Sequence, residues 1–200
     1  MKTNRKQETS FGAHREQERE ARRDIIVAAA ERVFALKPFD QVSIRDIARE
    51  AGISHALIYR YFPDQQSLFV EAFLRGAGEL MDLIAAVEKE GIESMAETYL
   101  RFLIDNDQYF RMMTHFMLDG SLSSELTERL NAMERMLLDR LDCFFPETGP
   151  EGGSRKLSHA FFAAMNGVLI SFRNYPGRNR SEVTDHMLQL GRIIAAKFKQ

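Results

Sequence analysis

The sequence contains no tryptophan, one cysteine and five prolines among its 200 residues. The single cysteine, Cys143, excludes an internal disulfide and any zinc site built from several cysteines. So few prolines leave long stretches that helices can occupy without interruption, and the composition therefore favours an all-α protein. Because no disulfide framework has to be maintained, we expect the chain in the reducing cytoplasm.

Long apolar runs are missing as well. The most apolar stretch, residues 161–170, is interrupted by Asn166 and Gly167 and is too short to cross a bilayer. The first twenty residues are polar and charged, without the apolar core of a secretory signal, which again favours the cytoplasm. Apolar residues still make up 44% of the chain, enough to fill a sizeable core.

Charge of one sign is not in large excess. The net charge is −2, but residues 1–70 hold 12 Lys and Arg against 10 Asp and Glu, whereas residues 71–200 hold 15 against 19. The first part is therefore slightly basic and the second slightly acidic. This small asymmetry has the sign expected if the first part contacts nucleic acid.

Residues 43–62 have the pattern of two short helices joined by a glycine corner. Ser43 and Asp46 have the spacing of a capping box, and apolar residues follow at i, i+3, i+4 and i+7. Gly52 stands where a left-handed residue ends a helix, and Ser54 can cap the next one. The pattern predicts a helix-turn-helix. Its second helix presents outward a small, flat, polar and cationic set that could enter a major groove: His55, Ala56, Tyr59 and Arg60.

Apolar stripes and breaks predict helices on both sides of this motif. One helix precedes it, with Ile26, Ala30, Val33 and Phe34 as its buried stripe. Glycines, prolines and polar breaks predict six more helices near residues 64–89, 92–105, 107–118, 122–145, 154–174 and 181–198. The total is about nine helices. The segment 146–153, rich in proline and glycine, is the clearest flexible connector.

Motifs of catalysis and metal binding are absent from the sequence. No serine nucleophile motif occurs, and a Gly-x-Gly at Gly76 and Gly78 lacks the third glycine of a dinucleotide site. Five histidines are scattered without metal-binding spacing: His14, His55, His115, His159 and His186. We therefore predict a protein that is not an enzyme and needs neither a cofactor nor a metal.

The helix-turn-helix region resembles the tetracycline-repressor-like (TetR/AcrR) family of bacterial regulators. The resemblance covers roughly residues 20 to 70 closely and the remainder only in helical layout. The matching positions, in the family's order and spacing, are Ile26, Ala29, Ala30, Phe34, Ser43, Ile47, Ala48, Ala51, Gly52, Ile53, Ser54, Ile58, Tyr59, Tyr61, Phe62 and Leu68.

The pattern and the resemblance together place the DNA contacts at Ser43, Arg45, Ser54, His55, Ala56, Tyr59, Arg60, Tyr61 and Gln65. Gln65 departs from the family, which usually has a lysine that meets a DNA phosphate at this position. A basic arm at the N-terminus could supply phosphate contacts instead, through Lys2, Arg5, Lys6, Arg15, Arg19, Arg22 and Arg23. The arm could equally be a solvated disordered tail, because glutamates are interspersed in it.

A set rich in phenylalanine and methionine lies in the predicted middle helices and the eighth. Flexible thioether side chains suit a pocket for an apolar or aromatic effector. The resemblance implies an effector pocket inside the bundle, bordered by these helices and by the helix that leaves the DNA-binding part. Ordinary core packing is the open alternative. The candidate ligand residues are Tyr99, Phe102, Phe110, Met113, His115, Phe116, Met117, Phe162, Met165 and Asn166.

The last two predicted helices each carry an apolar stripe, which can face the core on one side and a partner on the other. The resemblance implies a homodimer that pairs through these helices. Two reading helices about 34 Å apart would then meet successive major grooves of a near-palindromic operator. The candidate interface residues are Phe172, Val183, Met187, Leu190 and Ile194.

Three segments follow from these patterns. We predict a flexible basic arm over residues 1–19, a helix-turn-helix DNA-binding domain over 20–66, and a ligand-binding and dimerisation domain over 67–200. The predicted function is that of a transcriptional regulator, a repressor that a small apolar or aromatic effector releases from its operator. The alternative is a helical ligand-binding or protein-interaction module with lost or weak DNA binding.

Overall fold

The computed structural model describes residues 4–37, 39–119, 123–145 and 153–199. These residues form nine α-helices and two short 3₁₀ helices, Phe39–Gln41 and Glu88–Glu90, and they contain no strand. The all-α, nine-helix prediction is confirmed. The helices are α1 (Asn4–Leu36), α2 (Ile44–Ala51), α3 (His55–Ile58), α4 (Gln65–Val87), α5 (Ile92–Asp105), α6 (Asp107–Asp119), α7 (Ser124–Asp142), α8 (Gly153–Phe172) and α9 (Arg180–Phe198).

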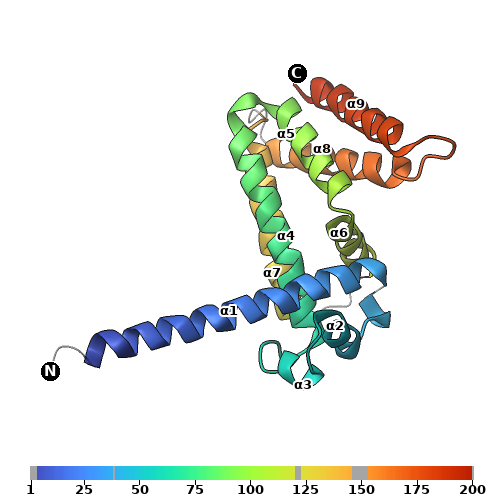
Figure 1. Cartoon of the computed structure of the whole chain (residues 1–200). Coiled ribbons are helices and arrows are strands. Elements are labelled where there is room, and N and C mark those ends of the chain that lie inside the picture. The colour runs from blue at the N-terminus through green and yellow to red at the C-terminus, as the bar shows by residue number, and fades with distance from the viewer. Residues whose placement is uncertain (1–3, 38, 120–122, 146–152, 200) are drawn as a thin grey trace.

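Helices α1 to α3 form a compact head at one end of the molecule, and α9 lies at the opposite end (Figure 1). The head encloses fully buried apolar side chains, among them Ile26, Ile47 and Ile58. The rings of Phe34 and Phe69 meet edge to face, 5.0 Å between centroids, so the first turns of α4 share the core of the head. One core therefore continues from the head into the bundle.

The predicted caps and corner of the helix-turn-helix are present. Ser43 and Asp46 form a reciprocal capping box at the start of α2. Gly52 ends α2 with φ 66° and ψ 31°, the left-handed conformation that a glycine adopts without strain. The second helix, α3, ends at Ile58, earlier than the sequence predicts, and turns carry the chain to Phe62. Pro63 disfavours the helical conformation of the residue before it, which explains the early end.

The N-terminal segment differs from its prediction. Instead of a flexible arm over residues 1–19, the structure has helix from Asn4 onward, continuous with α1. This first half of α1 projects from the body of the molecule (Figure 1). The segment has no proline and is rich in Glu, Arg and Gln, which are good helix formers, so its own propensity favours the helix.

Helices α4 to α9 form the bundle. α4 packs against α1, α5, α6 and α7, and α9 packs against α5 and α8. The predicted connector 146–153 lies almost entirely outside the described residues. No described helix combines the length and apolarity that crossing a membrane requires.

Candidate DNA-binding surface and effector pocket

Ile58 and Phe62 orient the outer face of α3 and of the turn that follows it, because both residues are buried in the core of the head. We call this outer face the reading face, since it carries most of the predicted DNA contacts. The intervening side chains therefore point outward. Tyr59 is 53% exposed although it is a large aromatic residue. The other predicted DNA-contacting residues that are exposed are Ser43, Arg45, Ser54, His55, Ala56 and Arg60, whereas Tyr61 and Gln65 are half-buried.

A shallow hollow runs between the starts of α2 and α4 and the outer face of α3. Of the nine predicted DNA contacts, the structure brings five to its walls. Its walls are formed by Ser43, Ile44, Arg45, His55, Tyr59, Pro63, Asp64 and Gln65. The hollow is open to solvent and borders the reading helix, as a strip of surface that follows a nucleic-acid backbone should.

The two serines of the motif hold helices in place. The Ser43 hydroxyl donates to Asp46 Oδ2 at 2.8 Å, and its oxygen accepts from the Asp46 backbone N–H at 3.2 Å. This hydroxyl donor, followed by the Ser43 backbone N–H and the Lys37 ammonium, lowers the pKa of Asp46 to about 2 although partial burial opposes the shift. The Ser54 hydroxyl oxygen accepts from the Leu57 N–H at 3.3 Å and so caps α3.

Gln65 braces the head rather than standing free on its surface. Its side-chain amide donates to the carbonyl oxygen of Phe39 at 2.8 Å, across the start of α4. The amide thereby ties α4 to the 3₁₀ helix that follows α1. A neutral, inward-directed amide supplies no positive charge where the family usually has a lysine.

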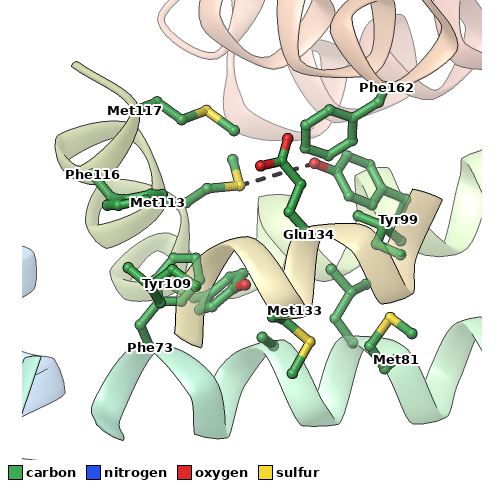
Figure 2. Close-up of a pocket in the computed structure, with 14 residues that line it drawn as sticks. Phe73, Met81, Tyr99, Tyr109, Met113, Phe116, Met117, Met133, Glu134 and Phe162 are labelled. Atoms are coloured by element: carbon green, nitrogen blue, oxygen red, sulfur yellow. Dashed lines mark hydrogen bonds between the residues drawn. The ribbon is translucent and has the colours of Figure 1, made fainter. Parts of the chain in front are cut away.

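An apolar cavity of about 60 Å³ lies inside the bundle between α4, α5, α6, α7 and α8 (Figure 2). Half of the ten predicted ligand residues line it: Tyr99, Met113, Phe116, Met117 and Phe162. The sequence analysis did not assign the walls that α4 and α7 contribute. These residues are Phe73, Ala77, Leu80, Met81, Leu130, Met133, Glu134 and Leu137, and Tyr109 of α6 completes the wall.

The apolar stripes of α4 and α7 were visible in the sequence. No local signal, however, showed that the two helices lie side by side. This pairing joins segments about sixty residues apart.

The other five predicted ligand residues lie outside the cavity wall. The ring of Phe102 packs edge to face on Tyr109, and the ring of Phe110 lies 4.4 Å below the Arg173 guanidinium. Met165 faces α9, where its sulfur lies near Gly191.

Asn166 acts from behind the wall. Its Oδ1 accepts from the Tyr99 hydroxyl at 2.8 Å and so orients a residue that does line the cavity. His115 is half-buried, and its Nδ1 is buried without a hydrogen-bond partner in the described part of the chain. Both residues are missing from the wall because the face of a helix that meets the cavity is narrower than its apolar stripe.

Burial keeps the two tyrosines at the cavity uncharged. Burial is the largest cause that raises the pKa of Tyr99; electrostatic interactions with Tyr109 and Glu134 add to it, and the hydrogen bond to Asn166 opposes it. Burial likewise raises the pKa of the Tyr109 phenol. Both hydroxyls therefore remain neutral near pH 7 and serve as hydrogen-bonding groups.

Helix α4 carries residues of both regions. Asp64 caps its first turn by accepting from the Ser67 N–H at 2.7 Å, directly after the reading helix. Phe69, in the second turn, packs in the head, and Phe73, in the third turn, lines the cavity. Arg75 pairs with Glu31 of α1, so the same helix is tied to the head by charge as well as by packing.

The predicted dimer surface requires a correction. Val183 and Met187 are buried against their own chain and cannot meet a partner. Phe172, Leu190 and Ile194 are half-buried. The most exposed large apolar residues of α8 and α9 are Ile170 and Ile193, at 65% and 51% exposure, and neither is among the predicted interface residues. Each helix has apolar residues on more than one side, and only the packing decides which side faces inward.

The fold and the exposed second helix of its corner define a helix-turn-helix protein. Residues 26–72 match the model of the family described as bacterial regulatory proteins, tetR family, and this part of the chain is similar to that family. The match spans α2 and α3 with most of the head's core, and it ends in the second turn of α4.

One curated relative is an HTH-type transcriptional regulator of Haemophilus influenzae whose name marks it as uncharacterized. It is 29% identical over 108 residues, which are 51% of this chain and 53% of the relative. The chain thus spans about half the length of the curated relative that it matches.

Solved structures share the fold at low identity. A transcriptional regulator from Rhodococcus has 17% identity and a TM-score of 0.71, over 88% of this chain and 96% of that one. The regulator FadR from Bacillus subtilis, solved in complex with stearoyl-CoA, has 18% identity and a TM-score of 0.65, over 84% of this chain and 96% of that one. These similarities extend the family's fold through the bundle.

Proposed function

We propose that this protein is a DNA-binding transcriptional regulator, a repressor that a small apolar effector releases from its operator. One observation carries the proposal: the outer face of α3 is exposed and polar, while Ile58 and Phe62 fix it from inside. A short helix held in this way can enter a major groove and present His55 and Arg60 to base edges.

The operator is expected to be nearly palindromic, because we propose a homodimer through α8 and α9. Ile170 and Ile193 are exposed on these helices, where a second copy would remove their side chains from water. Two copies related by a two-fold axis place two reading helices on one face of DNA, about 34 Å apart.

The basic N-terminal segment supplies further phosphate contacts in this proposal. Arg15, Arg19 and Arg22 recur at four and three residues and therefore share one face of α1. The same face continues into Ile26 and Val33, which are buried against the rest of the molecule. The arginine face is therefore turned toward the side of α1 on which the body lies.

The projecting part of α1 starts beside the reading helix. The Arg23 guanidinium lies 5.2 Å from the ring centre of Phe62, the buried residue that follows the turns after α3. Arginines along this part of α1 can therefore meet phosphates next to the half-site that α3 occupies. They would replace the contact that Gln65, bonded to Phe39, does not make.

Effector binding acts through α4 in this proposal. The dimer has two states, and an effector that binds the spread state better draws the population away from DNA. Phe73, Ala77, Leu80 and Met81 of α4 line the cavity, so widening the cavity shifts the helix whose first turn follows the reading helix. The fold that FadR shares with this chain, with stearoyl-CoA bound to it, supports an effector with a large apolar part.

Duplex affinity as a function of salt tests the regulator proposal. A DNA-binding dimer should show log K falling linearly with log salt concentration, and random sequences should bind more weakly than a duplex selected from a random pool. The competing function, a ligand-binding or protein-interaction module without DNA binding, predicts no selected sequence and no measurable salt slope. Gln65 and the small positive charge of the head keep this second candidate in the test.

A further inference from the structure

A single charged side chain, Glu134 of α7, lines the cavity within the described residues. The other walls are aromatic, thioether and aliphatic. In Figure 2 its carboxylate reaches toward the Tyr99 hydroxyl and the Met113 sulfur, which are themselves 3.9 Å apart. Glu134 has neither a hydrogen bond nor an ion pair in the described part of the chain, whereas Glu128 of the same helix pairs with Arg135.

Aromatic rings accompany this carboxylate. The rings of Tyr99 and Phe162 meet edge to face with centroids 6.0 Å apart, and Phe116 approaches Phe73 at 6.1 Å. The face of an aromatic ring attracts a cation, and a carboxylate attracts it more strongly. A negative or neutral head group gains no such attraction from the ring faces or from the carboxylate.

The exposure of Glu134 places the charge at the mouth of the cavity. Its side chain is exposed to solvent, while Leu80, Leu130 and Leu137 are buried deeper in the wall. A carboxylate in this position keeps part of its hydration, so leaving it unpaired costs little in the empty protein. An amphiphile can then pair its charge at the mouth while its apolar part leaves water.

We infer that the effector of this regulator is a lipophilic cation, an apolar molecule that carries one positive charge. The inference rests on the proposed function, and it names the chemical class of its ligand. The cationic group lies beside Glu134, next to the rings of Tyr99 and Phe162. The apolar part enters among the side chains of α4 and α7.

The cavity must widen to admit such a ligand. Its volume of about 60 Å³ is smaller than the roughly 150 Å³ that an apolar protein cavity needs to bind benzene. Four methionines line it: Met81, Met113, Met117 and Met133. Unbranched thioether chains change rotamer readily, so these residues can open the space and accept different shapes. This widening displaces α4, the helix that leads to the reading head.

Two isosteric probes separate the contribution of charge from that of shape. Phenyltrimethylammonium carries one positive charge, and tert-butylbenzene is its neutral counterpart of equal shape. Binding of each to the full chain is measured by NMR titration for the wild type and for Glu134→Gln. The matched control is Glu125→Gln, which removes the same charge nine residues earlier on α7, from an exposed position outside the cavity wall.

The wild type should bind the cation more tightly than the neutral probe. Glu134→Gln should lower the affinity for the cation by roughly tenfold and leave the affinity for the neutral probe unchanged. Glu125→Gln should leave both affinities unchanged. Equal losses for both probes would overturn the inference, as would tighter binding of the neutral probe to the wild type. Failure of the cation to bind overturns it as well.

Duplex binding, measured separately, keeps this inference apart from the proposed function. If the protein binds a selected duplex but prefers the neutral probe, the regulator proposal stands and the cationic effector is excluded. If it binds the cation through Glu134 but binds no duplex, the cation site stands and the regulator proposal is excluded. The midpoint of thermal unfolding of Glu134→Gln, expected to equal that of the wild type, confirms that lost binding is not lost folding.

Discussion

In the proposed regulator, single side chains of α3 and of the turn after it contribute separately to DNA affinity and to sequence preference. Tyr59 is outward and amphipathic, with a hydroxyl that can donate to a phosphate. His55 and Arg60 carry ring and guanidinium donors, which can reach acceptors on base edges. Ser54 and Ser43 cap helices, so removing either hydroxyl disturbs the position of a helix in addition to any contact with DNA.

We predict that Tyr59→Phe weakens binding to every duplex by a similar factor, with a loss of about 1 kcal/mol. Arg60→Ala or His55→Ala should instead change which bases are preferred, at a cost of about 1–3 kcal/mol for the selected duplex only. Competition between selected and random duplexes measures both effects. Equal effects of all three variants on both kinds of DNA would contradict this division of roles.

The capping box of α2 makes stability depend on acid pH. The pKa of Asp46 is lowered from 3.8 to about 2, first by the hydrogen bond from the Ser43 hydroxyl. A carboxyl whose pKa is lower in the folded state stabilises the fold above its unfolded pKa. That contribution is lost as the pH falls from about 4 toward about 2, because over this interval the unfolded chain binds a proton at Asp46 that the folded protein still excludes.

We expect Ser43→Ala to raise the pKa of Asp46 toward its ordinary value. Carbon-detected NMR titration of the Asp46 carboxyl group measures the shift directly. In urea unfolding, the stability difference between wild type and Asp46→Asn should shrink over the same pH interval. An unchanged Asp46 pKa in Ser43→Ala would show that the backbone N–H of residue 43 and the Lys37 ammonium, 3.3 Å away, hold the carboxylate instead.

Among the helices, α4 joins the head to the cavity, because it spans Gln65–Val87 without a break. Its two interior glycines have different surroundings. A Cβ on Gly76 would come within 2.4 Å of the Tyr109 ring, whereas a Cβ on Gly78 would meet nothing within 4 Å. Gly76 is therefore a position of close packing between α4 and α6, and it puts Tyr109 in contact with both α4 and the cavity.

We predict opposite effects for alanine at the two glycines. Gly76→Ala should lower the free energy of unfolding by about 1–3 kcal/mol, because the Tyr109 ring has to move. Gly78→Ala should raise it by about 0.5–1 kcal/mol, because alanine loses less backbone entropy in a helix. Urea denaturation compares the two variants. If both variants were more stable than the wild type, the Tyr109 ring would be able to move aside without lowering the free energy of unfolding.

The projecting half of α1 is the second element with a testable role. The variant with Arg15, Arg19 and Arg22 changed to glutamine should bind selected and random duplexes more weakly by the same factor. Its salt slope should fall by up to about 0.9 for each phosphate contact that is lost. Arg178 and Arg180, exposed near the start of α9, provide control positions at the other end of the molecule. Loss of discrimination between duplexes, rather than of affinity, would assign these arginines to base reading.

For the whole molecule, the proposed dimer is what would let two DNA-binding heads act together. Ile193→Glu places a charge on the exposed apolar surface of α9 and should convert the dimer to a monomer. Duplex affinity should then fall by more than tenfold, because one head loses the phosphate contacts of its partner. Sedimentation velocity measures the mass. Leu83→Glu, on α4 at 46% exposure, is the control and should leave the mass unchanged.

A dimer that persists in Ile193→Glu would exclude this surface as the interface. Val183 and Met187, which the sequence analysis chose, are unsuitable for the test, because each is buried within its own chain. A charge at either position would unfold the protein before it reported on assembly.

Local sequence was sufficient for the corner and for most of the helices, though not for the N-terminal half of α1 or the end of α3. Caps, glycine positions and apolar spacing involve residues at most a few positions apart, and the predicted helix bounds agree with the structure within a few residues from α4 to α9. The same short-range information predicted the outward side chains of α3, since Ile58 and Phe62 can only point inward if the corner is to close.

Which residues line the cavity and which lie on the solvent-exposed surface depends on contacts between segments that are distant in the sequence. Tyr99 is oriented by Asn166, 67 residues away, and Arg173 pairs with Asp107, 66 residues away. An apolar stripe shows that one side of a helix is buried but not which neighbour covers it. The sequence by itself therefore determined the elements, their order and the reading face, because these follow from interactions within a few residues. Only the tertiary structure decided that Glu134 borders the cavity and that Ile170 and Ile193 face solvent, because both depend on which helices pack together.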